Sequence, residues 1–234
     1  MGDLAEYGVV LVRAANPGPL TLTGTNTWIV DGWVIDPGPA LDAHLDAVAA
    51  AVGERAGGIA LTHDHADHVE GLDALRARLG GDVAVVSARG GARDGDVAGP
   101  LTVVSLPGHS DDHLAFVAGR VAFCGDAVLG EGSVFISGNL AGYLDGLERL
   151  RALDLAVLCP GHGPPVWDVR AKLDEYIAHR FDREQRLVAA LDRGLRSEDE
   201  LLDAAWDDAP EQLRPFAAVS LRAHLEKLRA EGRA

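Results

Sequence analysis

The sequence has few cysteines, few cations relative to anions, and no long apolar run. No apolar stretch approaches the ~20 residues that a helix needs to cross a bilayer, which argues against a membrane-spanning segment. The N-terminus has no basic patch followed by an apolar stretch, so we expect no signal peptide. Both cysteines, Cys124 and Cys159, end apolar runs. We interpret them as buried, reduced thiols, which are typical of a cytoplasmic protein.

The shortage of cations is uneven along the chain. The net charge is −15. Residues 1–169 carry 9 Lys/Arg against 22 Asp/Glu, whereas residues 170–234 carry 12 against 14. An acidic protein repels polyanions, so the composition does not indicate nucleic-acid binding. Bound metal cations would offset part of this acidity near their ligands.

Short apolar segments, interleaved with helical patterns, dominate the first part of the chain. We expect strands at 7–13, 27–36, 58–62, 83–86, 101–106, 114–117, 121–124 and 155–159, and helices at 41–52, 69–79 and 140–153. This order favours sheets that are covered by helices.

The pattern becomes purely helical after Pro164-Pro165. Residues 168–191 and 215–230 have helical spacing, and Ser197 with Glu200 fits a capping box that opens a third helix between them. The length allows one large domain and a small appendage. We therefore expect the large domain at 1–168 and a helical domain at 169–234.

Four metal-ligand side chains fall within six residues, directly after an expected strand and before a helix. They are His63, His65, Asp67 and His68. Imidazole and carboxylate groups suit zinc, and a loop that turns between them directs several at one point. A polar surface turn is the alternative interpretation. This density of ligand types favours a metal site.

Three more candidates follow later strands. His109 and His162 each come after a Pro-Gly turn, and Asp126 follows the apolar segment that ends at Cys124. Pro and Gly fix a tight turn and allow close backbone approach. Each residue alone would be interpreted as a turn former. Together with the first motif, they indicate a complete set of ligands.

In this order, His-x-His-x-Asp-His at 63–68 followed by His109, Asp126 and His162 resembles the metallo-β-lactamase superfamily, over the whole chain. The resemblance implies an α/β fold, an αββα sandwich with the metal site at one edge of the two sheets. Ile35-Asp36-Pro37-Gly38 is similar to the early strand-turn motif of the family. It implies that Asp36 orients a ligand histidine and is not itself a ligand.

The resemblance also implies a role for each ligand in a dinuclear, zinc-type hydrolase site with two metals per chain. The first metal would be held by His63, His65 and His109, the second by Asp67, His68 and His162, and Asp126 would bridge them. Two metals about 3.5–4 Å apart share a hydroxide and polarise the reacting oxygen. Asp67 would orient that hydroxide as the catalytic residue. Such ligands also accept Mn or Fe.

Departures from other branches narrow the expected chemistry. Oxygen-reducing diiron members have glutamate where this chain has His65, and no flavin-binding domain follows. The main class of zinc β-lactamases has cysteine at the position of Asp126. Only 35 residues separate Asp126 from His162, too few for the cap of mRNA-processing nucleases. We therefore expect neither electron transfer nor β-lactam hydrolysis as the main activity.

A closer resemblance is to the branch of β-lactamase-like protein 2. Its motifs are similar to Asn16-Pro17-Gly18-Pro19, Gly24-Thr25-Asn26-Thr27, Pro107-Gly108-His109-Ser110-Asp111-Asp112-His113, and His179-Arg180 with Arg183-Glu184. The branch includes a mitochondrial single-strand endoribonuclease and acyl-carrier-protein thioesterases of fungal polyketide pathways. Its C-terminal part is winged-helix-like, and we expect the β-wing to be short or missing here.

The leading functional hypothesis is hydrolysis of an ester or thioester, because the acidic body suits an uncharged reacting group. A single-strand endoribonuclease is the first alternative, and it would need a basic track. A mononuclear iron persulfide oxygenase and a metal-holding module without turnover are the others. The expected partner is a small-molecule substrate, with single-stranded RNA as the alternative and no membrane. A homodimer is compatible with the sequence.

Four further histidines lie outside this ligand set. His113 begins a strand, where a structural role or a leaving-group acid is open. His179 lies in an arginine-rich helix, where a solvated face or a phosphate contact is open. We interpret His44 and His224 as helix-surface residues, and the tryptophans as core.

Overall fold

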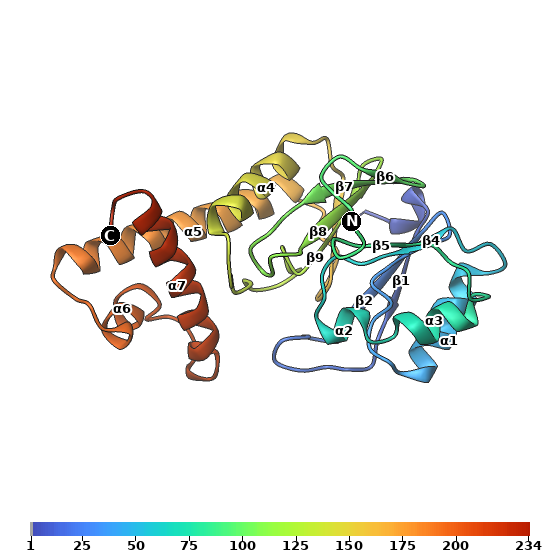
Figure 1. The fold of residues 1–234 in the computed structure, drawn as a ribbon, viewed down its shortest axis with the longest axis horizontal. Coiled ribbons are helices and arrows are strands. Elements are labelled where there is room, and N and C mark those ends of the chain that lie inside the picture. The colour runs from blue at the N-terminus through green and yellow to red at the C-terminus, as the bar shows by residue number, and fades with distance from the viewer. Residues whose placement is uncertain (1) are drawn as a thin grey trace.

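The computed structural model describes residues 2–234 and contains two five-stranded sheets (Figure 1). The first has the order β1-β2-β3-β4-β5, formed by Val9–Arg13, Asn26–Val30, Trp33–Ile35, Gly58–Ala60 and Val85–Val86. The second has the order β10-β9-β8-β7-β6, formed by Val157–Pro160, Val121–Gly125, Leu114–Ala118, Leu101–Ser105 and Val97–Ala98. Both sheets are mixed, with β3-β4, β4-β5 and β9-β10 parallel.

The sheets pack face to face, with helices on both outer sides. Along β2, Trp28 points into the inter-sheet core and Ile29 points to the helix side, as strand alternation requires. The ring centroids of Trp28 and Phe123 are 6.4 Å apart across the core. Helices α1 (Asp42–Val52) and α3 (Leu72–Arg78) contribute to the apolar cluster outside the first sheet. Helices α4 (Leu140–Ala152) and α5 (Val169–Asp192) cover the second sheet. The expected αββα sandwich is therefore confirmed.

The first sheet differs from expectation at residues 27–36. We expected one strand, but β2 and β3 form an antiparallel hairpin. Asp31 and Gly32 have φ values of 46° and 76°, in the left-handed region that a tight hairpin turn needs. The Asp-Gly pair was the available signal. The helix expected at 69–79 is shorter, since α3 begins at Leu72, and a separate short helix, α2 (Ala66–Val69), precedes it.

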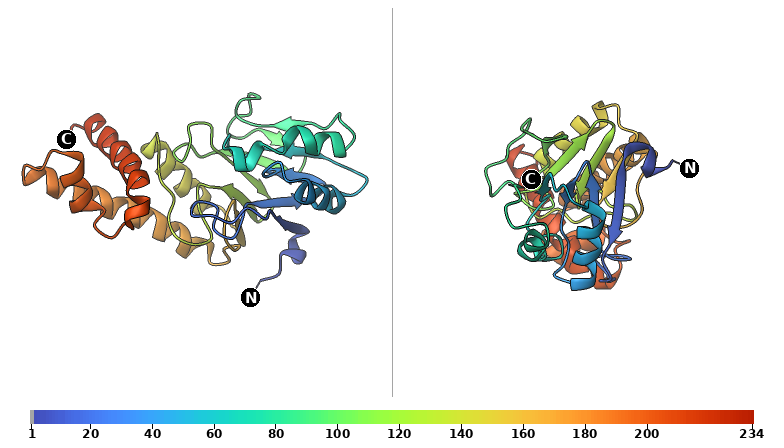
Figure 2. Two further views of the ribbon diagram at one scale, coloured as in Figure 1. Left: turned by 90° about the horizontal axis from the view of Figure 1, so that it is seen from below. Right: turned by 90° about the vertical axis from the view of Figure 1, so that its right-hand side faces the viewer.

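The C-terminal part is helical, as expected. Helix α5 extends away from the sandwich, and α6 (Glu198–Ala205), the short turn η2 (Glu211–Leu213) and α7 (Arg214–Ala230) fold back on it (Figures 1 and 2). We call the part of α5 from His179 onward, together with α6, η2 and α7, the helical module. The capping box of Ser197 and Glu200 is confirmed. Within residues 2–234 no strand follows β10, so the described chain contains no β-wing.

Helix α5 belongs to two apolar clusters. Leu173 and Tyr176, in its first half, lie in the cluster outside the second sheet. Leu187 and Ala190, near its end, pack with α6 and α7. One continuous helix therefore connects the module to the sandwich, and the domain boundary at 168/169 stays a prediction. No helix of the described chain is long and apolar enough to cross a membrane.

Candidate metal centre

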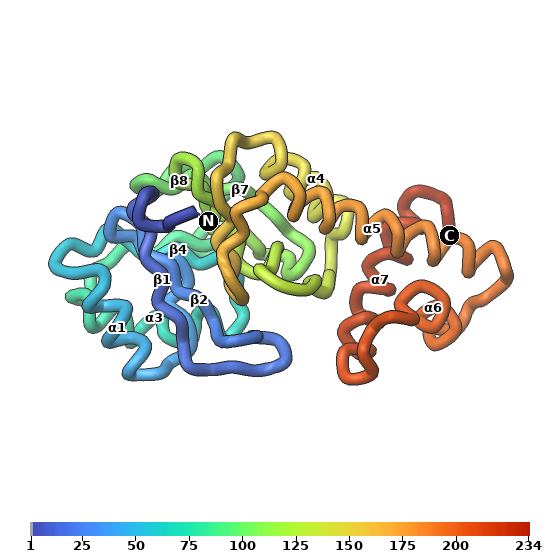
Figure 3. Tube along the Cα trace, turned by 180° about the vertical axis from the view of Figure 1, so that it is seen from behind, coloured from blue at the N-terminus to red at the C-terminus, as the bar shows by residue number. Residues whose placement is uncertain are grey.

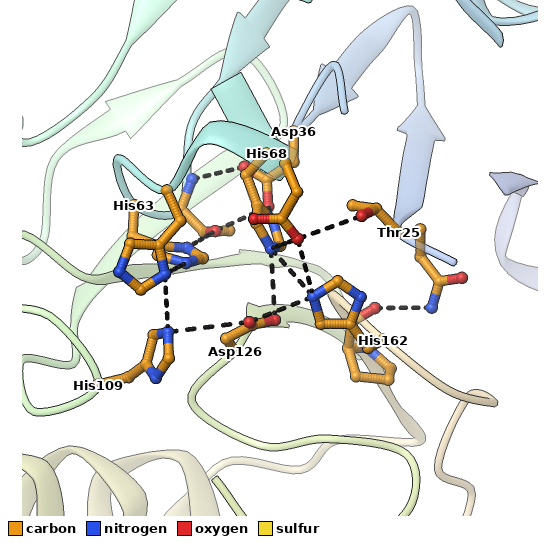
Figure 4. Close-up of polar contacts among 12 residues, drawn as sticks. Thr25, Asp36, His63, His68, His109, Asp126 and His162 are labelled. Atoms are coloured by element: carbon orange, nitrogen blue, oxygen red, sulfur yellow. Dashed lines mark hydrogen bonds and ion pairs between the residues drawn. The ribbon is translucent and has the colours of Figure 1, made fainter. Parts of the chain in front are cut away.

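The candidate ligands gather where strands of both sheets end. Strands β7 and β9 both run antiparallel to β8, and β10 runs parallel to β9, so the carboxyl ends of β7, β9 and β10 share one edge. The loops that leave these ends carry His109, Asp126 and His162, and the loop after β4 carries His63. Figure 4 shows these side chains pointing toward one another. The structure brings all seven predicted residues together.

Three histidines form a first group of donors. His65 Nδ1 lies 3.0 Å from His63 Nε2 and 3.0 Å from His109 Nε2. One nitrogen of each ring lies within 4.8 Å of a nitrogen of each of the other two rings. Ligand atoms at the ~2.0–2.1 Å of a Zn–N bond are about 3.3 Å apart when the geometry is tetrahedral. The spacing of this group therefore fits one metal ion.

Asp67, His68 and His162 form a second group. His162 Nε2 lies 3.2 Å from Asp67 Oδ2 and 3.3 Å from His68 Nε2. His68 Nε2 lies 3.5 Å from Asp67 Oδ2. This spacing also fits one small cation with nitrogen and oxygen ligands.

Asp126 lies between the two groups. Its Oδ2 is 3.3 Å from His162 Nε2 and 3.8 Å from His109 Nε2. The side chain is buried, and its Oδ1, which has no hydrogen-bond partner among residues 2–234, lies 3.5 Å from His68 Nε2. A buried carboxylate oxygen without a partner is costly unless a cation lies beside it. The position of Asp126 therefore suits a bridging ligand.

Burial and the carboxylates set the protonation of the imidazoles. Burial lowers the pKa of His63 well below its usual value, and lowers that of His109 to about 4 although Asp126 opposes it. Both rings are therefore neutral near pH 7, as metal ligands must be. Burial also opposes a charge on His162, but the hydrogen bonds to Asp126 and Asp67 and the charge of Asp126 together outweigh it and raise the pKa to about 9. A bound divalent cation would replace that proton beside the carboxylate.

Asp36 supports the second group from behind, as expected. Its carboxylate accepts hydrogen bonds from Thr62 N and Thr62 Oγ1, both at 2.7 Å, and lies 2.9 Å from His68 Nδ1. Because the Nδ1–H donates to Asp36, His68 Nε2 is free to face the second group. Asp36, His63 and His68 also lie close enough to form a third donor set. The Asp36 oxygens are already engaged, so we assign no metal to it.

A cavity of about 680 Å³ opens from the metal ligands toward the helical module. Four groups of residues line it. They are the donors His65, Asp67, His109, Asp126 and His162, the loop residues Pro19, Leu20 and Leu22, the loop residues Leu129 and Glu131–Phe135, and the module residues His179, Arg180, Arg183, Trp206, Asp208–Pro210, Leu213, Phe216, Ala217 and Ser220. Figure 3 shows the loop between β1 and β2 extending toward the module. The volume is typical of a small-molecule site.

The comparisons with known proteins agree with this geometry. A family model for the metallo-beta-lactamase superfamily matches residues 78–162, and a model for the beta-lactamase associated winged helix domain matches residues 197–234. A solved metallo-beta-lactamase family protein from Thermus thermophilus is similar with a TM-score of 0.74 and 26% identity, over 96% of this chain and 94% of that one. The chain belongs to the metallo-β-lactamase superfamily.

Two curated relatives are similar to this chain over most of its length. The Caenorhabditis elegans Beta-lactamase-like protein 2 homolog is 29% identical, over 96% of this chain and 85% of that protein. The Paecilomyces divaricatus Atrochrysone carboxyl ACP thioesterase AgnL7 is 34% identical, over 79% of this chain and 65% of that protein. The match thus spans just under two thirds of the fungal protein. The superfamily fold supports a hydrolase-type enzyme that holds divalent metal.

Residues that no sequence pattern identified support the candidate ligands. Thr25 Oγ1 donates to Asp67 Oδ2 at 3.3 Å and accepts from Asn16 Nδ2 at 2.9 Å. Asn26 Nδ2 donates to Pro160 O and Gly163 O, which fixes the turn that carries His162. The motifs containing Asn16, Thr25 and Asn26 were noted in the sequence, but no role followed from them.

Of the other histidines, His44, His113 and His224 are buried and His179 is partly buried. His113 stacks on His63 with ring centroids 4.9 Å apart, and within residues 2–234 neither of its ring nitrogens has a hydrogen-bond partner. His113 therefore forms a wall behind the ligand. The expectation that His44 and His224 lie on the surface was wrong, since their exposed fractions are 5% and 0%. His44 Nε2 lies 3.0 Å from Thr27 Oγ1.

Both cysteines are free and buried, so the predicted buried thiols are confirmed in position. Burial raises the pKa of Cys124 to about 12. Such a thiol does not ionise near neutral pH, and neither cysteine lines the cavity. A cysteine nucleophile is therefore not part of this centre.

Proposed function

We propose that this chain is a dinuclear, zinc-type hydrolase that cleaves an ester or thioester. The observation that carries the proposal is that Asp126 lies between two donor groups at the end of a largely apolar cavity. His63, His65 and His109 would hold one cation, and Asp67, His68 and His162 the other. Two such cations supply a hydroxide nucleophile at neutral pH and polarise the carbonyl oxygen.

The residues around the centre would orient the reactants. Asp67 is half-buried and faces the cavity, so its carboxylate can accept a hydrogen bond from the attacking water. Thr25 donates to the same carboxylate and restricts its rotation. We therefore propose Asp67 as both metal ligand and catalytic residue. Activity would fall if Asp67 lost its contact with either the metal or the attacking water.

The arginine side chains in the cavity lining favour a carbonyl substrate over a phosphodiester. Arg183 donates to Asp208 at 2.7 Å and to Ala205 O at 2.6 Å. Arg180 is buried and donates to Val134 O at 2.5 Å. These guanidinium groups are already engaged with the protein. A polyanion needs accessible cations along its backbone, and this lining does not offer them.

The surface of the helical module leads to the same preference. Lys227 and Arg233 pair with Glu184, and Arg222 pairs with Glu198. These pairs neutralise the basic residues that an RNA track would need. Single-stranded RNA is therefore the alternative that the experiment below tests. The similar fungal protein is named an ACP thioesterase, which supports the carbonyl substrate.

Two metals are preferred over a single iron. A mononuclear iron oxygenase would use only one of the two donor groups. Here Asp67, His68 and His162 converge as closely as the three histidines do. Imidazole and carboxylate ligands accept Zn, Mn and Fe, and we propose zinc as the resident metal. A cytoplasmic location and a separate module at 169–234 complete the proposal.

The experiment that tests this function uses one metal-analysed preparation of the full chain. The same sample is assayed on a panel of acyl thioesters and on a single-stranded RNA oligomer, with and without chelation. We expect about two metals per chain and thioester turnover that chelation removes. RNA cleavage with intact thioesters would replace the proposal with the endoribonuclease alternative. One iron per chain with oxygen consumption on persulfides would indicate the oxygenase.

A further inference from the structure

An aromatic chain connects a metal ligand to the helical module. The ring of Phe135 lies 4.7 Å from that of His109 and 5.2 Å from that of Phe216 on α7. His109 Nδ1 also lies 3.3 Å from Phe135 O. All three side chains line the cavity. The wall beside His109 is therefore built partly by α7, whose Phe216 is 107 residues further along the sequence.

The loop that carries Phe135 is fixed by the two long C-terminal helices. Ile136 N donates to Ser220 Oγ of α7 at 3.0 Å, and this bond is buried. On the α5 side, Tyr176 Oη donates to Gly132 O at 3.0 Å, and Arg180 donates to Val134 O. These bonds satisfy backbone groups that would otherwise be buried without partners. The wall is thus preformed and does not depend on a ligand to order it.

The cavity as a whole is largely apolar, and η2 and α7 contribute apolar side chains to its module side. Leu213, Phe216 and Ala217 face it from η2 and α7, and Leu20 and Leu22 contribute from the loop between β1 and β2. On the same side, Arg183 pairs with Asp208, and Arg180 donates to Val134 O. An apolar wall around a cavity whose other end is polar fits a substrate with one reacting polar group and one apolar arm.

We propose that the helical module forms a pocket for the apolar acyl group of the substrate, with Phe216 as its main specificity-determining residue. The proposal rests on the proposed hydrolase function and names its substrate class: esters or thioesters whose acyl group extends beyond the carbonyl as an aliphatic or aromatic arm. The carbonyl would lie at the metal donors, and the arm would lie against Phe216 and Leu213. The module would then select substrates rather than bind nucleic acid.

The test compares acyl chain lengths on the metal-loaded full chain. Acetyl, hexanoyl and decanoyl thioesters of N-acetylcysteamine are assayed for kcat/KM with the wild type, Phe216→Ala and Phe216→Leu. Phe181→Ala is the matched control, since Phe181 is an exposed aromatic residue of α5 outside the cavity lining. Each methylene that leaves water contributes up to about fourfold. We expect wild-type kcat/KM to rise with chain length.

The variants separate an acyl pocket from a merely structural wall. Phe216→Ala should lower kcat/KM for the decanoyl substrate about tenfold or more and for the acetyl substrate less than about twofold. Phe216→Leu should retain most of the preference, and Phe181→Ala should change neither value. An equal loss on all chain lengths would show that Phe216 only positions His109, and it would overturn the proposal. No loss on any substrate would also overturn it.

A binding measurement keeps the pocket separate from the hydrolase function. Octanamide is titrated calorimetrically into the metal-loaded wild type and Phe216→Ala. Binding that Phe216→Ala weakens would support the pocket even if no thioester is turned over, in which case the hydrolase proposal alone fails. Thioester turnover without octanamide binding would overturn the pocket and leave the hydrolase proposal standing.

Discussion

Asp36 lies 2.9 Å from His68 while its own backbone is in the left-handed region, with φ of 54°. A non-glycine residue there is strained, and such strain persists only where other contacts over-determine it. Those contacts are present: Asp36 N donates to Ala60 O, and Thr27 Oγ1 donates to Asp36 O. The strain places a carboxylate behind the imidazole of His68, which links the fold of the first sheet to the second donor group.

Replacing Asp36 by Asn should weaken the second metal site without removing the first. The two carboxylate oxygens of Asp36 accept from Thr62 N, Thr62 Oγ1 and His68 Nδ1. An amide has only one acceptor oxygen, because its NH2 group donates, so the orientation of His68 is lost. Loss of such a supporting partner typically costs 10–100-fold in metal affinity. Competition with a chromophoric chelator measures it. Asp31→Asn is the control, since Asp31 also has a positive φ but lies exposed in a hairpin. Equal affinity in both variants would contradict the role of Asp36.

Thr25 is expected to act through Asp67. Thr25→Val keeps the shape but removes the hydroxyl that donates to Asp67 Oδ2 and accepts from Asn16. Losing a hydrogen bond to a charged group should lower kcat about tenfold. KM should change little, because Thr25 does not line the cavity. Thr25→Ser restores the hydroxyl and should recover most of the rate. The idea fails if serine and valine behave alike.

The position of each candidate ligand was predictable because every one follows an apolar strand in a recognisable local motif. The walls of the cavity were not, because the contact between Phe135 and Phe216 joins distant segments. For His224 a signal existed. Ala217, Leu221 and Leu228 lie on the same helical stripe and are buried, so the spacing placed His224 on the apolar face. We expected His224 on the surface because its side chain is polar.

Removing metal should abolish hydrolysis and lower the thermal midpoint. Asp67 and Asp126 carry negative charge in a partly buried cluster, and bound cations would stabilise the native state over the unfolded chain. A ligand at 100 times its Kd contributes about 2.7 kcal/mol, reduced by any affinity for the unfolded state. Thermal unfolding with chelator, and after zinc is restored, measures the shift. Asp126→Asn, with one charge fewer, should show a smaller difference. An unchanged midpoint would argue against a structural contribution of metal.

We expect His224 to set part of the acid stability of the fold, independently of metal. His224 is fully buried on α7, its ring lies 5.5 Å from that of Trp206, and within residues 2–234 neither ring nitrogen has a hydrogen-bond partner. Burial lowers its pKa to about 3, and Arg180 and Lys227 add to the effect. The folded protein therefore holds His224 neutral, while the unfolded chain protonates it near its usual 6.5.

Stability from this group is complete above pH 6.5 and is lost as the pH falls toward about 3. The contribution lost between neutral pH and pH 5 is about 2 kcal/mol. His224→Phe keeps a ring against Trp206 and has no proton to bind, so its free energy of unfolding should fall less over that interval. Urea unfolding of both proteins at pH 7 and pH 5 gives the difference directly. Because the metal-site histidines are the same in both proteins, their titration cancels, and equal pH slopes would mean that the pKa of His224 is not lowered by folding.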